Sequence, residues 1–179
     1  QVIQFFAADR GSLFRFYDLA VSPLALQHRE EFFRAWRTAV DKVDFDHLQP
    51  QGRVDYILLR NKLDHELREI DLARKRLEEV QGLLPFAPTI IDLKEARQRV
   101  DPLDAQKTAA TIVALREQVE KLAKQLDAKP STQPAIKKTV ASRAAHNVDQ
   151  LRDALREWYG FYYSYDPNFT WWMAQPYKD

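Results

Sequence analysis

Apolar residues recur at steps of three and four along most of the chain, and this spacing limits the fold more than any other feature. Because 3.6 residues make one helical turn, each such series forms an apolar stripe on one helix face. Only four glycines occur, and the nine prolines fall between the periodic segments, as in helices joined by short turns. No segment alternates apolar and polar residues long enough to predict a strand. The sequence therefore predicts an all-α fold, a bundle of long, mostly antiparallel helices with short proline-marked turns.

The first half of the chain contains two clear helix starts. Ser22 followed by Pro23 is typical of an N-cap with proline at the first helical position. Pro50 opens a second, longer helix, which we expect to end at a C-cap glycine, Gly82, after about 45 Å. The apolar stripes comprise Phe33, Trp36, Val40 and Val43 in the first helix, and Tyr56, Leu59, Leu63, Leu67, Ile70, Leu77 and Val80 in the second.

A short helix and the start of a longer one are predicted next. Thr89 with Asp92 resembles a capping box before a helix that ends near Val100. The string DPLD at residues 101–104 then restarts the chain with a cap, a proline and an acid in the first helical turn. An acid is favoured there because the helix dipole is positive at its N-terminus.

Residues 105–126 have nearly the heptad spacing of a coiled coil. Three heptads do not separate an intermolecular coil from an antiparallel pair inside one bundle, and the short proline turns favour the internal pair. The last long helix is expected to begin near Pro134 and to loosen at Gly160, near its end. The stripes comprise Ile112, Leu115, Val119, Leu122 and Leu126, and then Ile136, Val140, Ala144, Val148, Leu151, Leu155, Trp158 and Tyr162.

Length and charge exclude several classes of protein. A chain of 179 residues predicts one helical domain, residues 1–179. The net charge of +1 gives no overall attraction to nucleic acid, and the one local basic excess, around Lys137, Lys138 and Arg143, lacks interleaved aromatics. No stretch approaches the roughly 20 apolar residues that span a bilayer. The absence of cysteine excludes a disulfide, a thiolate nucleophile and a cysteine metal site.

The string DHELRE, residues 64–69, is the strongest candidate for metal chemistry. Zincin-type peptidases place two histidines four residues apart on one helix, with a glutamate beside the first. His65 and Glu66 match the first half of that pattern, but Glu69 stands at the second histidine position. The mixed charges favour a solvated helix face. A small enzyme whose metal is held by His65, Glu69 and a distant ligand is the alternative.

The remaining polar residues suggest no catalytic centre. His28, His47 and His146 are isolated in the sequence, and Asp44 with Asp46 has the composition of a turn and cap. No serine lies in a nucleophile elbow, and there is no glycine-rich phosphate loop. We therefore assign no catalytic, cofactor-binding or metal-binding residue in this chain.

The C-terminal segment is unusually aromatic. A helix with aromatic residues on every side cannot bury all of them against one neighbour. If Phe169, Trp171 and Trp172 lacked partners they would expose on the order of 500 Å², as large as the patches that mark contacts in other monomers. We expect an interface here, with the chain continuing into more of the same polypeptide or meeting a partner, and with self-association of the isolated chain. The candidate interface residues are Phe169, Trp171, Trp172 and Tyr177.

Two segments carry a resemblance to a known family. The strings VDFDHLQPQGRVDYILLRNKLDHELREI and LREWYGFYYSYDPNFTWWMAQPY resemble the N-terminal helical part of a bacterial family known as domain of unknown function 885. Members of that family resemble zincin-type metallopeptidases. The resemblance extends from about Phe14 to Tyr177 and rests on helix packing and aromatic placement rather than on a catalytic signature.

The resemblance implies a function for the chain as part of a larger protein. It implies a non-catalytic N-terminal helical region of a zinc metallopeptidase, which flanks the substrate cleft and supports a downstream catalytic part. Zinc and its ligands would belong to that part, because no residue here matches the family's zinc motif. The implied partners are the downstream region and a peptide substrate, and the implied location is periplasmic or secreted. The alternative is a stand-alone helical interaction module that binds a partner through its aromatic C-terminal end.

Overall fold

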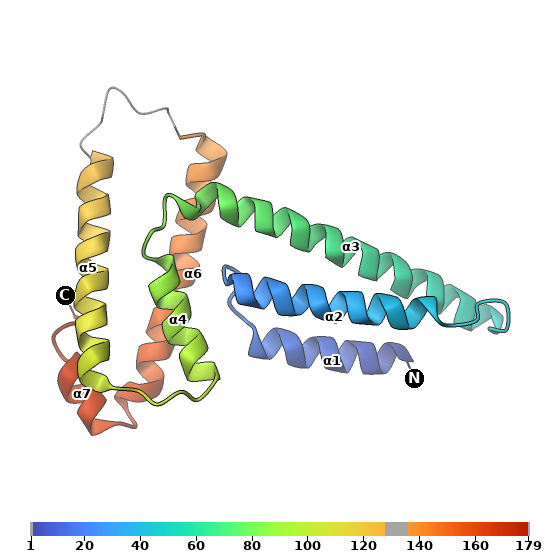
Figure 1. Cartoon of the computed structure of the whole chain (residues 1–179), viewed down its shortest axis with the longest axis horizontal. Helices are drawn as coiled ribbons and strands as arrows, with labels where there is room; N and C mark the ends of the chain where they lie inside the picture. Colours follow the sequence, from blue (N-terminus) through green and yellow to red (C-terminus); the bar gives the residue numbers. More distant parts are fainter. Residues whose placement is uncertain (1, 128–135, 179) are drawn as a thin grey trace. The chain divides into compact units, whose positions relative to one another are not determined.

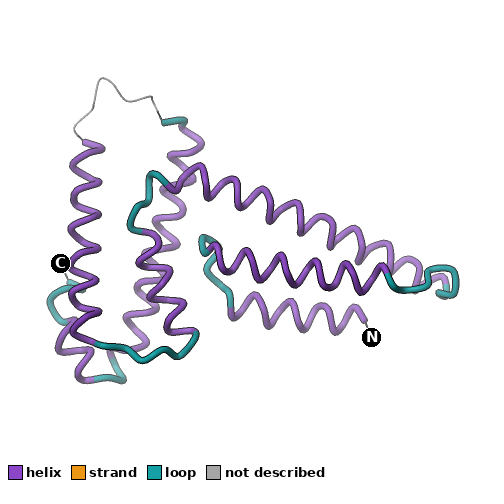
Figure 2. The backbone as a smooth tube through the Cα atoms, in the orientation of Figure 1, coloured by secondary structure: helices purple, strands orange, loops and turns teal. Residues whose placement is uncertain are grey.

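The computed structural model describes residues 2–127 and 136–178. Within these ranges the chain forms helices and no strand, which confirms the predicted all-α helical bundle (Figures 1 and 2). The helices are α1 (Val2–Phe16), α2 (Pro23–Asp41), α3 (Pro50–Gln81), α4 (Ala87–Gln98), α5 (Ala105–Asp127), α6 (Lys138–Tyr163) and α7 (Pro167–Met173).

The chain divides into two compact units, Gln1–Glu79 and Val80–Asp179. We call them unit 1 and unit 2 and describe each by itself. Unit 1 contains α1, α2 and almost all of α3, and unit 2 contains α4 to α7. The single helical domain over residues 1–179 stays a prediction.

Unit 1 is built from three helices whose successive members run in opposite directions (Figure 1). Helix α1 was not predicted, and it adds Phe6 to the core, with ring centroids 5.4 Å from Trp36 and 6.4 Å from Phe33. The apolar stripes predicted for α2 and α3 supply the rest of this core. Its buried members are Phe6, Phe33, Val40, Leu59, Leu63 and Ile70.

Local capping explains where α2 and α3 begin. The Ser22 hydroxyl accepts a hydrogen bond from the Ala25 N–H at 3.0 Å, so the predicted N-cap is confirmed. Helix α3 begins at Pro50, also as predicted, and Arg53 donates from Nε to the Leu48 carbonyl at 3.0 Å. Proline suits both starts because the first helical N–H has no partner within the helix.

Charged contacts join α2 to α3 beside this core, and two of them are hydrogen-bonded. The Arg37 Nε donates to Asp64 Oδ1 at 2.7 Å, and Arg74 donates to the carboxylate of Glu30. Both pairs link residues that are more than 25 positions apart in the chain, so they stabilise the packing of the two helices rather than either helix alone.

In unit 2, α4 packs along α6, and α7 contacts both α5 and α6. Lys94 of α4 is buried, and its Nζ lies 3.1 Å from Glu157 Oε2 of α6. The largest fully buried side chains in this unit are Leu151, Trp158, Phe169 and Met173. Aromatic rings therefore form the centre of unit 2 at its C-terminal end.

The predicted capping box of the short helix is wrong. Helix α4 begins at Ala87, two residues before Thr89, and its N-cap residue Phe86 makes no side-chain capping bond. Thr89 and Asp92 therefore lie inside the helix. Pro88 occupies the first turn, where its missing N–H costs nothing, and this starts the helix without a polar cap.

Two further predictions about helix ends differ from the structure, and a third concerns residues that the structure does not describe. Gly82 directly follows α3, but its φ is not positive, so it is not a left-handed cap glycine. Gly160 lies inside α6, which continues without interruption to Tyr163. The predicted start near Pro134 lies outside the described residues, whose helix α6 begins at Lys138.

The apolar stripe of α5 is buried over only half its length. The buried residues of α5 all lie between Ala105 and Leu115, on one face of the helix, whereas Val119 and Leu126 further along are exposed. Burial within the chain therefore covers the first half of the coiled-coil-like segment.

Candidate functional site

The C-terminal end of unit 2 concentrates the aromatic residues that the sequence singled out. Asp166 caps α7 by accepting hydrogen bonds at its Oδ1 from the N–H groups of Asn168 at 2.9 Å and Phe169 at 3.2 Å. This cap, followed by Pro167, forces a short helix directly after α6. The turn folds α7 back so that its apolar side meets α6.

Phe169 is fully buried, which corrects its place in the predicted interface. Its ring centroid lies 5.4 Å from that of Trp158, 5.7 Å from Tyr159 and 5.1 Å from Tyr162. A side chain enclosed by three rings of its own chain offers no surface to a partner. Phe169 anchors α7 on α6 instead.

Tyr177 also has a partner within the chain. Its ring stacks on Tyr159 with the centroids 3.5 Å apart and the planes nearly parallel. Burial raises the pKa of the Tyr159 hydroxyl, with the neighbouring tyrosines acting in the same direction. Tyr177 is half-buried, so only part of its ring is available to another molecule.

Trp171 and Trp172 are the two predicted residues that reach the surface. Trp171 is 69% exposed, and Trp172 is half-buried with its ring centroid 4.8 Å from that of Trp171, edge to face. We call this pair the tryptophan surface. Trp171 lies two residues beyond Phe169 on α7, roughly on the opposite side of the helix, and so points away from the core. Trp172 lies three residues beyond Phe169, closer to the buried face, which agrees with its half-burial.

A second feature of this end is a groove that sequence reasoning did not find. It has a volume of about 780 Å³ and lies between the end of α4 and the α6–α7 turn. No periodicity links these segments, which are about 60 residues apart, so only the fold brings them together. The groove is lined by Arg97, Val100, Asp101, Leu103, Phe161, Tyr162, Tyr165, Asp166 and Pro167.

The chain is strained where it passes this groove. Val100 has a φ of 60°, in the left-handed region that a β-branched residue rarely adopts. It follows α4 in a Schellman motif, in which the Asp101 N–H donates to the Ala96 carbonyl at 2.9 Å and the Val100 N–H donates to Arg97 at 3.0 Å. The motif places Arg97 and Asp101 on the same groove.

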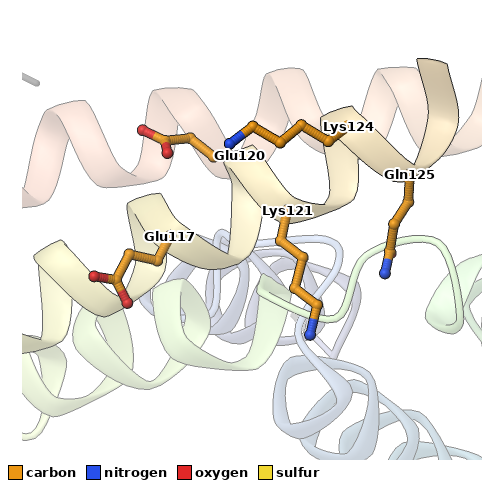
Figure 3. A pocket seen from close by; sticks show the side chains of 5 residues that line it. All are labelled: Glu117, Glu120, Lys121, Lys124 and Gln125. Carbon is orange, nitrogen blue, oxygen red and sulfur yellow. The ribbon is translucent and has the colours of Figure 1, made fainter. Parts of the chain in front are cut away.

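Two other hollows lack the features of a site. The depression shown in Figure 3 lies on one helix, α5, and its side chains leave the helix in different directions without converging. The other, in unit 1, has a volume of about 230 Å³ and a mostly apolar lining with one carboxylate, that of Asp55. The first is lined by Glu117, Glu120, Lys121, Lys124 and Gln125, and the second by Val2, Ile3, Val40, Val43, Leu48, Gly52, Asp55, Tyr56 and Leu59.

The metal candidates of the sequence all lie on α3 of unit 1. His65 and Glu69 are exposed on α3, and Glu66 is paired with Lys62 at 2.7 Å. In residues 2–127 and 136–178, no three histidine, aspartate or glutamate side chains gather closely enough to hold a metal ion.

The remaining polar candidates make local contacts. Asp44 accepts a hydrogen bond from the Asp46 N–H at 3.2 Å and lies 2.6 Å from His47 Nδ1, as in a turn. His28 contacts Glu31, and His146 contacts Gln150, each within one helical turn.

Across the part of the chain that the structure describes, no helix is both long and apolar enough to cross a bilayer.

No family model, curated protein or solved structure matches this chain.

Proposed function

We propose that this chain is a non-catalytic helical region of a larger zinc-dependent peptidase and that its tryptophan surface packs against the catalytic part of the same polypeptide. The observation that carries the proposal is the exposure of Trp171 beside Trp172 on α7. The resemblance to domain of unknown function 885 supplies the identity of the larger protein. In that reading zinc and the general base lie outside residues 1–179.

The physical support comes from the free-energy cost of exposing tryptophan. A tryptophan buries on the order of 200 Å² when it is covered, so the exposed part of Trp171 represents a large unrealised gain. Tryptophan is also enriched among the residues that dominate binding energy at interfaces. The neighbouring rings of Phe169 and Tyr177 hold α7 in place, so the tryptophan surface is presented on an anchored helix.

The same surface could serve a stand-alone helical interaction module that binds a separate protein. The two functions differ in whether the surface is covered by the same polypeptide. They agree that the described residues supply a docking surface and support rather than a catalytic centre.

The intact mass of the natural gene product separates these functions. We would detect the protein in its source cells with an antibody against residues 1–179 and measure its mass. A product several times heavier than 21.0 kDa supports the peptidase region, and its additional sequence must then contain a zinc motif. A product of about this size contradicts that proposal and leaves the interaction module.

A further inference from the structure

We propose that the groove between α4 and the α6–α7 turn binds an acidic peptide segment, in which a glutamate or aspartate neighbours an aromatic residue or proline. This site is separate from the tryptophan surface, since neither Trp171 nor Trp172 lines the groove. Its volume of about 780 Å³ is within the range of small-ligand sites and suits two or three residues of a peptide.

The charge of the groove selects an anion. The Arg97 guanidinium lies over the Phe161 ring, 4.9 Å from its centroid, and no carboxylate among the described residues pairs with it. A guanidinium that lies over an aromatic ring still has N–H donors for hydrogen bonds to a carboxylate, which arginine binds in a two-pronged geometry.

The two acids of the groove are already engaged. Asp101 Oδ2 accepts from the Arg99 Nη2 at 2.9 Å, and Asp166 Oδ1 accepts from two backbone N–H groups of α7. Arg97 is therefore the charged group of the lining that has no counter-charge of its own. Arg97 already lies over the Phe161 ring, so a cationic ligand would have to compete with Arg97 for that ring and would be repelled by its charge. The groove is therefore not suited to bind a cation in an aromatic cage.

The aromatic rings supply the second half of the recognition. Tyr165 is 83% exposed and Phe161 is 54% exposed, while Tyr162 is half-buried and burial raises the pKa of its hydroxyl. Exposed rings beside an arginine favour a ligand that places a flat or ring-shaped group next to its carboxylate. Aromatic-lined grooves that bind proline-rich segments use the same kind of contact.

A nucleic-acid strand fits these charges less well. Each nucleotide carries a phosphate, and the carboxylates of Asp101 and Asp166 in the groove would repel these phosphates. Stable binding of a nucleic acid also needs several basic contacts, whereas the groove lining has one basic residue, Arg97. A peptide with a single carboxylate needs only Arg97.

The test is a titration of the isotope-labelled full chain with blocked peptides, followed by nuclear magnetic resonance. The probe is a five-residue peptide with proline, glutamate and phenylalanine at its centre. Matched peptides carry glutamine or lysine in place of glutamate. We expect saturable shifts at residues 97–101 and at Tyr165, and binding at least about tenfold weaker for the glutamine peptide, because one charged hydrogen-bond pair is lost.

Variants of the chain locate the effect. Arg97→Gln should abolish the preference for glutamate, and Arg97→Lys should keep the charge but bind more weakly than the natural chain. Tyr165→Ser should weaken the glutamate and glutamine peptides by similar factors. Arg152→Gln, which removes an exposed arginine of α6 outside the groove, is the matched control and should change nothing.

Several results would overturn the proposal. Three of them would come from titrations of the natural chain. These are the absence of a saturable shift with any peptide, equal affinity for the glutamate and glutamine peptides, and tighter binding of the lysine peptide. An oligothymidylate that binds the same residues more tightly than the glutamate peptide would assign the groove to nucleic acid instead.

Discussion

Val100 stores local strain at the end of α4. A left-handed backbone costs an L-residue roughly 1–2 kcal/mol, and the cost is greater for a branched side chain. The side chain is 86% exposed, so packing does not offset the strain. The Schellman hydrogen bonds of residues 96–101 hold the conformation instead. Strain of this kind concentrates at binding sites, which agrees with the place of Val100 on the groove.

Val100→Gly should therefore raise the free energy of unfolding by about 1 kcal/mol, because glycine adopts a positive φ without a steric cost. Urea unfolding followed by circular dichroism measures the change. Val54→Gly, at an exposed position inside α3, is the matched control and should lower the stability by a few tenths of a kcal/mol. A decrease for Val100→Gly would contradict the strain.

Glu30 makes the stability of unit 1 depend on pH. Hydrogen bonds from Arg74 and then Arg34 hold the pKa of the Glu30 carboxyl below its ordinary value of 4.5. Because the folded-state pKa is the lower one, the stabilisation is complete above about pH 4.5. It is lost as the pH falls through the folded-state pKa.

Glu30→Gln should accordingly lower the stability near neutral pH and lessen the loss of stability on acidification. Urea unfolding from about pH 7 to about pH 2 shows whether the two proteins converge in acid, as expected. Glu117→Gln on α5 controls for the removal of one negative charge. A constant difference between wild type and Glu30→Gln at every pH would disprove the linkage.

At the scale of the element, α7 is stabilised mainly by its N-cap and by one buried side chain, Phe169. A helix of seven residues has too few internal hydrogen bonds to be stable alone. Its Asp166 cap and the burial of Phe169 against three rings of α6 stabilise it in place. The position of the tryptophan surface therefore depends on the burial of Phe169, which holds α7 against the rest of unit 2.

Phe169→Ala should lower the free energy of unfolding by about 3–5 kcal/mol, as expected when a fully buried phenylalanine leaves a cavity. Trp171→Ala on the same helix is the matched control and should change stability by less than about 0.5 kcal/mol. Urea unfolding of both variants measures the difference. Equal effects would mean that Phe169 does not anchor α7.

At the scale of the whole molecule, the surface properties follow from which aromatic residues remain outside the cores of the two units. Unit 1 and unit 2 each bury a core of their own, but Trp171 stays outside the core of unit 2. An exposed tryptophan next to a second one favours contacts between molecules when no other partner is present.

We therefore expect the isolated chain to self-associate through the tryptophan surface. Sedimentation velocity over a range of concentrations should show association for the natural chain. Replacing both Trp171 and Trp172 with serine should weaken the association at least about tenfold. Phe5→Ser, which alters an exposed ring of unit 1, is the matched control. Monomers at all concentrations for both proteins would contradict the expectation.

The sequence alone determined most helix positions in this protein. The starts of α2 and α3 were predictable because a cap and a proline act within one helical turn. Helix α1 was missed because no such cap precedes it. The left-handed Val100 was missed because a branched residue is among the least expected at that position.

Only the tertiary structure decided the candidate sites. Phe169 and Trp171 are two aromatic residues only two positions apart, yet one is buried and the other exposed, because α5 and α6 pack against one side of α7. Arg97 contacts Phe161, which lies 64 positions later in the sequence, and no local sequence pattern near either residue predicts this contact. Helix formation depends on neighbours within a turn or two, whereas burial and groove lining depend on contacts between distant segments, which packing alone selects.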